Sequence, residues 1–307
     1  MHHMMNSPTP PPANQATGPL THSLSSRLAI ANEGWWPAGA TLALDFANDR
    51  YMAGENSIAA FSNVSGVNVT RTTSAWALTP QNLPIAAGVD QALIVPQRGL
   101  VSEVARARLN PLDVTTTTFG TGANTSVSAV QTTLPDGTSG TAYRLIMPAT
   151  GSTFLNLSDA FASGAHSIQA WVKQAGVLAE AKFGLGVGAL PVERTSTQDW
   201  QLFQLEQSAS GFAATINNRF DTFATDVLVV WPDVQQGPLS SPILTPGQTA
   251  IRAEASIIVT DINTNFGLPA DHGFDVIYED GSTTTLTAVA GDLTIPVSTK
   301  AYRSIVG

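Results

Sequence analysis

The stretch DVLVVWPDVQQGPLSSPILTPG, residues 226–247, decides how this chain must fold. It starts as an apolar run that ends at Trp231, and it continues without a helix into a segment punctuated by prolines. Proline cannot donate a backbone hydrogen bond, so it borders strands rather than filling the middle of a sheet. We interpret the stretch as the last strand of a β-sandwich, buried on both faces, which then delivers the chain to the domain surface.

Short strand-like runs precede this stretch, and turn residues separate them. They are TSVSAVQTT (125–133), AYRLIMP (142–148), STFLNLS (152–158), HSIQAWVKQ (166–174), KFGLGVGAL (182–190), DWQLFQLEQ (199–207) and GFAATI (211–216). Strands at this spacing without intervening helices predict an antiparallel β-sandwich, most simply a jelly roll, over residues 111–252.

The rest of the chain predicts an arm and two further β regions. Residues 1–19 contain five prolines and almost no apolar anchor, which predicts a disordered or extended arm. Residues 20–110 predict a β-containing attachment region, in which GLVSEVARARLN (99–110) is the best helical or turn-like stretch. Residues 253–307 predict a small C-terminal β domain with a hairpin at Asp280-Gly281. The predicted fold class is therefore all-β.

Composition excludes several functions. Charged residues make up 12% of the chain and the formal net charge is −9, which argues against nucleic acid and against anionic membrane surfaces. The chain has no cysteine, so it has neither disulfides nor thiolate metal sites. The sequence contains no His-Glu-x-x-His pair, no P-loop and no Gly-x-Ser-x-Gly elbow. We therefore predict a protein that is not an enzyme and needs no cofactor.

Acidic residues give one metal alternative. The groupings are Asp45 with Asp49, Glu193 with Asp199, and Asp271 with Asp275. Each could be part of a calcium site or half of a glycosidase pair. We interpret them as turn and surface acids and predict no metal, with calcium at DFAND (45–49) as the alternative, because that turn offers oxygen ligands.

Tryptophans give the candidate binding residues, because sugars stack on aromatic faces that polar groups flank. Alternation along residues 166–174 places Trp171 on one face with Gln169 and Lys173, opposite the aliphatic side chains. We predict a carbohydrate site at these three residues, with Trp200 as a second candidate. The alternative is that a loop or a neighbouring subunit covers Trp171. Trp231, in a run that is apolar on both faces, is predicted to be core.

The order of motifs resembles a family of bacteriophage virion proteins. The motifs are LDFANDRYMAG (44–54), RGLVSEVARARLNP (98–111), LPDGTSGTAYRL (134–145), SIQAWVKQAG (167–176) and the opening stretch, within residues 40–252. That family comprises tail-fibre and head-spike proteins, including gene transfer agent head spikes. Ala107, Arg108 and Gln236 depart from its usual residues. The resemblance implies a lectin-like, carbohydrate-binding jelly roll on the particle surface.

Three functions follow as hypotheses. The first is a virion spike or fibre protein that forms a homo-oligomer, contacts other virion proteins through its N-terminal region and binds host surface polysaccharide. The second is an architectural adaptor or decoration protein that binds no glycan. The third is a glycan-active enzyme, which the absence of a catalytic motif disfavours.

Overall fold

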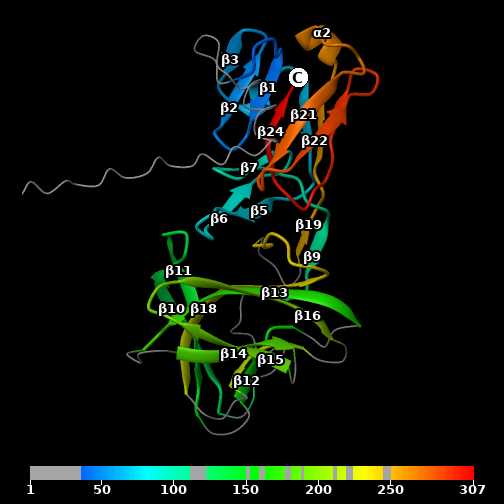
Figure 1. Cartoon of the computed structure of the whole chain (residues 1–307). Coiled ribbons are helices and arrows are strands. Elements are labelled where there is room, and N and C mark those ends of the chain that lie inside the picture. Colours follow the sequence, from blue (N-terminus) through cyan, green and yellow to red (C-terminus); the bar gives the residue numbers. More distant parts are fainter. Residues whose placement is uncertain are drawn as a thin grey trace, which may run out of the picture.

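The computed structural model describes residues 36–110, 122, 124–149, 153–158, 163–176, 181–187, 190–209, 213–218, 224–244 and 250–307. They form two domains, one above the other in Figure 1, built almost entirely of antiparallel β-sheets, so the all-β prediction is confirmed. Within these ranges the helical segments are η1 (Phe61–Asn63) and α2 (Ile262–Phe266). None of the described helices is long and apolar enough to cross a membrane. The arm predicted over residues 1–19 lies outside the described residues.

The first domain combines both ends of the described chain. Its largest sheet runs in the order β22 (Thr283–Thr287), β21 (Gly273–Tyr278), β24 (Tyr302–Val306), β1 (Leu42–Asp45), β2 (Arg50–Ala53), β3 (Asn56–Ile58). Strand β8 (Gly99–Val101) pairs with β24 and with β7 (Leu93–Val95). A second sheet of this domain has the strand order β23 (Leu293–Ile295), β20 (Ser256–Val259), β4 (Val67–Thr70). A third sheet is the hairpin of β5 (Ala75–Leu78) and β6 (Pro84–Ala87).

The regions predicted separately over 20–110 and 253–307 thus share one sheet and one core. Leu44 pairs with Ile305 across β1 and β24, and both are fully buried in the same cluster as Phe46 and Phe274. The predicted hairpin at Asp280-Gly281 is present between β21 and β22. Gly99 fixes β8 against β24: its φ is +123°, and a Cβ there would lie 2.1 Å from the Tyr302 carbonyl oxygen. Any other residue would push the two strands apart.

The second domain is a two-layered sandwich of residues 106–252 (Figure 1). One layer runs β10 (Ser126–Thr133), β11 (Ser139–Met147), β18 (Thr225–Gln236), β13 (Gly164–Gln174), β16 (Gln201–Ala209), with β9 (Arg106–Arg108) and β19 (Ala250–Arg252) alongside. The other layer runs β12 (Thr153–Asn156), β17 (Ala214–Asn218), β14 (Ala181–Val187), β15 (Leu190–Ser196). Ile168, Phe183 and Ile216 pack between the layers, as the strand pattern predicts.

Two local predictions are wrong. Residues 99–110 contain the strands β8 and β9 rather than a helix or a turn, because each strand finds a distant partner: Leu100 pairs with Tyr302, and Arg108 pairs with Gln235. The run 182–190 is not one strand, since β14 ends at Val187 and β15 begins at Leu190 as a hairpin. In both places long-range pairing overrides the local pattern.

Strand β18 shows how a proline fits inside a central strand. The register between β13 and β18 shifts, so that Gln169 pairs with Asp233 but Trp171 pairs with Val230. Trp231 has a φ of +50° at this bulge. A bulge leaves residues out of the hydrogen-bond ladder, which is where Pro232 can be accommodated. Trp231 is half-buried rather than core, and it packs against Trp171 on the outer face of the layer.

Candidate functional site

The outer face of the β10–β16 layer meets the first domain. The hairpin β5–β6 contributes Trp76 and Leu78, which pack on a cluster containing Trp171 and Val230. The Trp171 indole Nε1 donates a hydrogen bond to the Asn82 carbonyl oxygen at 3.1 Å. The ring of Trp231 meets that of Trp171 edge to face at 5.5 Å. The domains are thus joined by apolar packing of Trp76 and Leu78 and by the hydrogen bond from Trp171, beside a ring contact within the sandwich.

The prediction of an exposed stacking platform at Trp171 is therefore wrong. Alternation assigns Trp171 correctly to the outer face of its sheet, but the hairpin turn at Asn82 covers that face, and only 1% of the residue is exposed. The alternative that a loop covers Trp171 describes the molecule. A buried ring cannot stack on a sugar from solvent.

The other predicted site residues are separated. Gln169 is buried, and its amide Nε2 donates to Asp233 Oδ2 at 2.8 Å and to the Ser240 carbonyl oxygen at 3.2 Å. Lys173 and Trp200 lie together instead, with Lys173 Nζ 4.8 Å from the Trp200 ring centroid, and the Trp200 indole donates to the Thr133 carbonyl oxygen. The predicted group of four thus divides into a buried pair and a half-buried pair.

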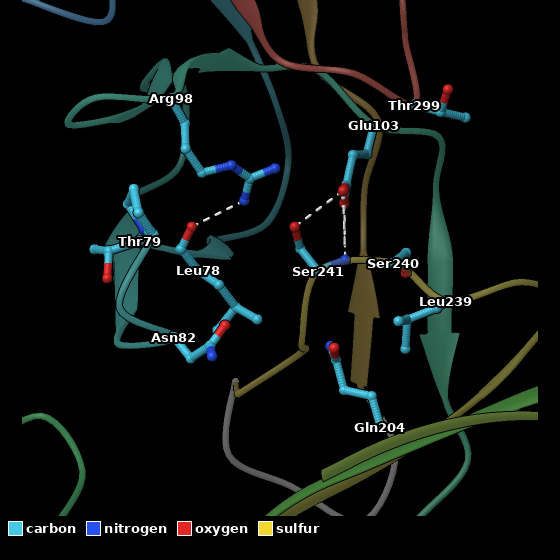
Figure 2. A pocket seen from close by; sticks show the side chains of 11 residues that line it. Leu78, Thr79, Asn82, Arg98, Glu103, Gln204, Leu239, Ser240, Ser241 and Thr299 are labelled. Atoms are coloured by element: carbon cyan, nitrogen blue, oxygen red, sulfur yellow. Dashed lines mark hydrogen bonds between the residues drawn. The ribbon is translucent and has the colours of Figure 1, made fainter. Parts of the chain in front are cut away.

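A cleft of about 360 Å³ opens beside the aromatic contact, where both domains and their linkers meet (Figure 2). The first domain contributes the β5–β6 turn and Arg98, the sandwich contributes Gln204 from β16, and the proline-rich exit after β18 contributes a wall. The lining residues are Leu78, Thr79, Pro80, Asn82, Arg98, Glu103, Gln204, Leu239, Ser240, Ser241 and Thr299. The stretch that decides the sandwich therefore also forms this cleft.

The charged groups of the cleft are already paired within the protein. Glu103 accepts a hydrogen bond from the Ser241 hydroxyl at 2.9 Å and forms an ion pair of 2.7 Å with Arg252 Nη1. Arg98 donates to the Leu78 carbonyl oxygen at 2.8 Å and to Glu279 at 2.7 Å. Burial of Glu279 opposes its ionisation, but the hydrogen bonds from Arg98 and from the Ala301 N–H lower its pKa. These pairs fix the shape of the walls.

Two amides give the cleft its open polar groups. Asn82 sits at the hairpin turn with a φ of +60°, and its side-chain amide makes no hydrogen bond with any described residue. Gln204 Nε2 donates to Gln169 Oε1 at 3.0 Å. Figure 2 shows both side chains at the lower end of the cleft, one from each domain. A carboxamide both donates and accepts hydrogen bonds, which suits a neutral ligand rich in hydroxyl groups.

A buried carboxyl group stands behind the cleft wall. Asp233 is fully buried, and its Oδ2 accepts hydrogen bonds from Gln169, from Gln235 at 2.6 Å and from the Ile243 N–H at 3.1 Å. Oδ1 accepts none from the described residues. Burial raises the pKa of Asp233, although these hydrogen bonds and the charge of Arg108 oppose the rise. Asp233 therefore holds Gln169, which in turn holds Gln204.

The turn considered for calcium is closed by its own side chains. Asp45 accepts hydrogen bonds from the Asn48 amide at 2.8 Å and forms an ion pair with Arg50. In the described part of the chain, no three His, Asp or Glu side chains gather as a metal site would require.

The sequence indicated only two parts of the cleft, the exit segment after β18 and the neighbourhood of Gln169. The signal for Asn82 was available, because TPQNLP (79–84) between two apolar runs is typical of a hairpin turn.

Comparisons with known proteins give only distant likenesses. No family model and no curated protein matches the chain. Among solved structures, an exo-beta-agarase matches with a TM-score of 0.31 and 12% identity over 38% of this chain and 23% of its own. The CBM22-1 xylan-binding domain from Paenibacillus barcinonensis Xyn10C matches with 0.30 and 12%, over 46% of this chain and 100% of its own. The CBM22-1-CBM22-2 tandem domain of that protein matches with 0.32 and 10%, over 67% and 90%. Likenesses this distant assign no ligand to this chain.

Proposed function

We propose that this chain is a non-catalytic spike or fibre protein of a phage-like particle, and that the cleft between its domains binds a carbohydrate of the host surface. The observation that carries the glycan part is the pair of amides, Asn82 and Gln204, which face one cleft from two domains. A planar carboxamide can bind a sugar hydroxyl group both ways, because its NH2 group donates a hydrogen bond and its carbonyl oxygen accepts one. The site proposed from sequence at Trp171 thus moves to the cleft beside it.

The rigidity of the cleft supports binding. Its walls are held by the ion pair of Glu103 with Arg252 and by the hydrogen bonds of Arg98. A site whose side chains are already ordered loses little conformational entropy when a ligand arrives. The net charge of −9 leaves neutral glycans as better ligands than acidic ones.

The particle setting rests on the motif order that resembles phage spike and fibre proteins. In that setting the N-terminal region contacts other virion proteins, and the chain forms a homo-oligomer. Electron microscopy of the parent particle with a labelled antibody tests this setting, and labelling confined to host membranes would contradict it.

Binding is tested with a glycan array, followed by titration of the best glycan against Asn82→Gly. Glycine removes the amide while tolerating the left-handed backbone of this turn. We expect about a tenfold loss of affinity, the effect of roughly 1.4 kcal/mol of hydrogen bonding. Asn124→Gly is the matched control, because Asn124 is also left-handed and exposed, in the sandwich domain. Equal affinity for both variants and the parent would place the site elsewhere.

A purely architectural role is the second candidate. It is favoured by the aromatic junction, which buries Trp171, the residue that pointed to a sugar, in a contact between domains. A glycan array on which the full chain binds nothing, together with labelling on the particle, would support this role.

A further inference from the structure

A second cavity adjoins the cleft. It has a volume of about 160 Å³ and shares Glu103, Leu239, Ser240 and Thr299 with the cleft. Its remaining wall comes from Val104, Arg106, Pro238, Val297 and Ser298. The two spaces therefore meet along one boundary, on either side of the Leu239–Ser240 segment.

The two neighbouring spaces differ in chemistry. Val104, Pro238, Leu239 and Val297 give the smaller cavity a largely carbon surface. Its two charged residues have protein partners: Arg106 Nη1 donates to the Gln236 carbonyl oxygen at 3.0 Å, and Glu103 pairs with Arg252. Val104 and Leu239 are 43% and 36% exposed, so this carbon surface stays open to solvent. An open apolar surface beside a polar cleft suits a ligand that has both characters.

The backbone around the smaller cavity is anchored on both sides. The Leu239 N–H donates to the Glu206 carboxylate, and the Ser240 hydroxyl donates to Gln235 Oε1 at 2.7 Å. Opposite them, the Ser298 N–H donates to the Ser102 carbonyl oxygen at 2.6 Å. The cavity is thus formed before any ligand arrives, which lowers the entropy cost of filling it.

We infer that the cleft selects a sugar that carries a methyl group, either in an acetamido substituent or as a 6-deoxy carbon, and that the methyl enters the smaller cavity. This inference rests on the proposed function. Hydroxyl groups of the ring face Asn82 and Gln204, while the methyl group contacts Val104 and Leu239. A methyl group cannot form hydrogen bonds with the polar residues of the cleft, and a hydroxyl group would lose its hydrogen bonds to water in the apolar cavity. Each part of the sugar therefore matches one of the two spaces.

Two pairs of sugars separate the two sources of the methyl group. N-acetylglucosamine is compared with glucose, and L-fucose with L-galactose, by saturation-transfer NMR titration against the full chain. We expect the methyl-bearing member of at least one pair to bind about tenfold tighter, since one methyl group in an apolar pocket gives discrimination of that order. The pair that shows the preference identifies the source.

Val104→Phe then tests the cavity itself. The larger ring fills the space, so we expect the methyl preference to vanish while the methyl-free sugar binds as before. Val89→Phe is the control, because Val89 is also exposed and does not line either space. Melting temperatures of the two variants verify that both remain folded.

The outcomes distinguish this inference from the proposed function. Suppose that the sugars bind and that Asn82→Gly lowers their affinity, but that neither pair shows a preference for the methyl-bearing member. The inference is then wrong, and the proposal of a glycan-binding cleft stands. A methyl preference that survives Val104→Phe also overturns the inference. If none of the four sugars binds, the inference is wrong, and if the glycan array is empty as well, both proposals fail.

Discussion

Trp171 and Gln169 stand two residues apart on β13 and on the same side of its sheet, yet they serve two different parts of the domain junction. Trp171 is closed against the β5–β6 turn, whereas Gln169 braces Gln204 at an open cleft. The difference lies in what covers each residue, since the first domain's turn covers Trp171, whereas Asp233 and Ser240 of the sandwich and its exit segment cover Gln169. Alternation along a strand therefore tells which face a side chain occupies, and segments distant in the sequence decide what covers that face.

The largest effect is expected at the closed part of the junction. Trp171→Ala should lower the free energy of unfolding by about 3–5 kcal/mol, because it empties a fully buried site. Chemical denaturation measures the loss, and Trp200→Ala, at a half-buried ring, should cost less. A Trp171→Ala protein as stable as the parent would mean that the hairpin does not cover this face in solution.

The open part of the junction depends on an ion pair. Glu103→Ala should lower the free energy of unfolding by about 3 kcal/mol, since it leaves the Arg252 guanidinium, only 3% exposed, without its carboxylate. Glu193→Ala is the comparison, because its pair with Lys182 is about 40% exposed on both sides and should change stability by less than about 1 kcal/mol. Equal melting temperatures for the two variants would contradict the buried pair.

Asp233, behind the cleft wall, should make stability depend on pH. Burial raises its pKa in the folded protein above the ordinary value of 3.8. The folded state then holds a proton that the unfolded state releases, so this stabilisation is present below pH 3.8 and is lost as pH rises through the folded pKa. The free energy of unfolding of Asp233→Asn, compared with that of the parent, should therefore be higher at pH 7 than at pH 4. Urea denaturation of both proteins at the two pH values measures this difference. A difference between variant and parent that is the same at both pH values would exclude this role.

The smallest effect on stability is expected at Lys173, which was predicted as a site residue but does not line the cleft. Lys173→Met keeps the apolar stem but removes the charge over Trp200, so we expect a loss of about 0.5 kcal/mol. Binding of any glycan found on the array should not change. A large loss of binding in this variant would return the site to the Lys173–Trp200 pair.

Local sequence patterns marked most strands of the sandwich, apart from the β14–β15 hairpin, but did not indicate the architecture of the first domain. Turn residues at short spacing mark strands within residues 111–252, and Asp280-Gly281 marks the β21–β22 hairpin of the first domain. These signals can be recognised because they act between neighbours in the chain. Nothing near Leu44 indicates that its partner is Ile305. The same limit hid the cleft, since Asn82, Glu103 and Gln204 come together only when the two domains dock.

The pairing of β24 with both β1 and β8 has a consequence for biosynthesis. A ribosome delivers all of residues 106–252 before any residue of β20–β24, so the sandwich can fold while the first domain still lacks three of the eight strands of its largest sheet. During that interval β1 and β8 present bare edges, which are the features through which nascent β-proteins aggregate. The closing event is the arrival of Tyr302–Val306, and we expect the time between these two events to set how much newly made chain needs the help of a chaperone.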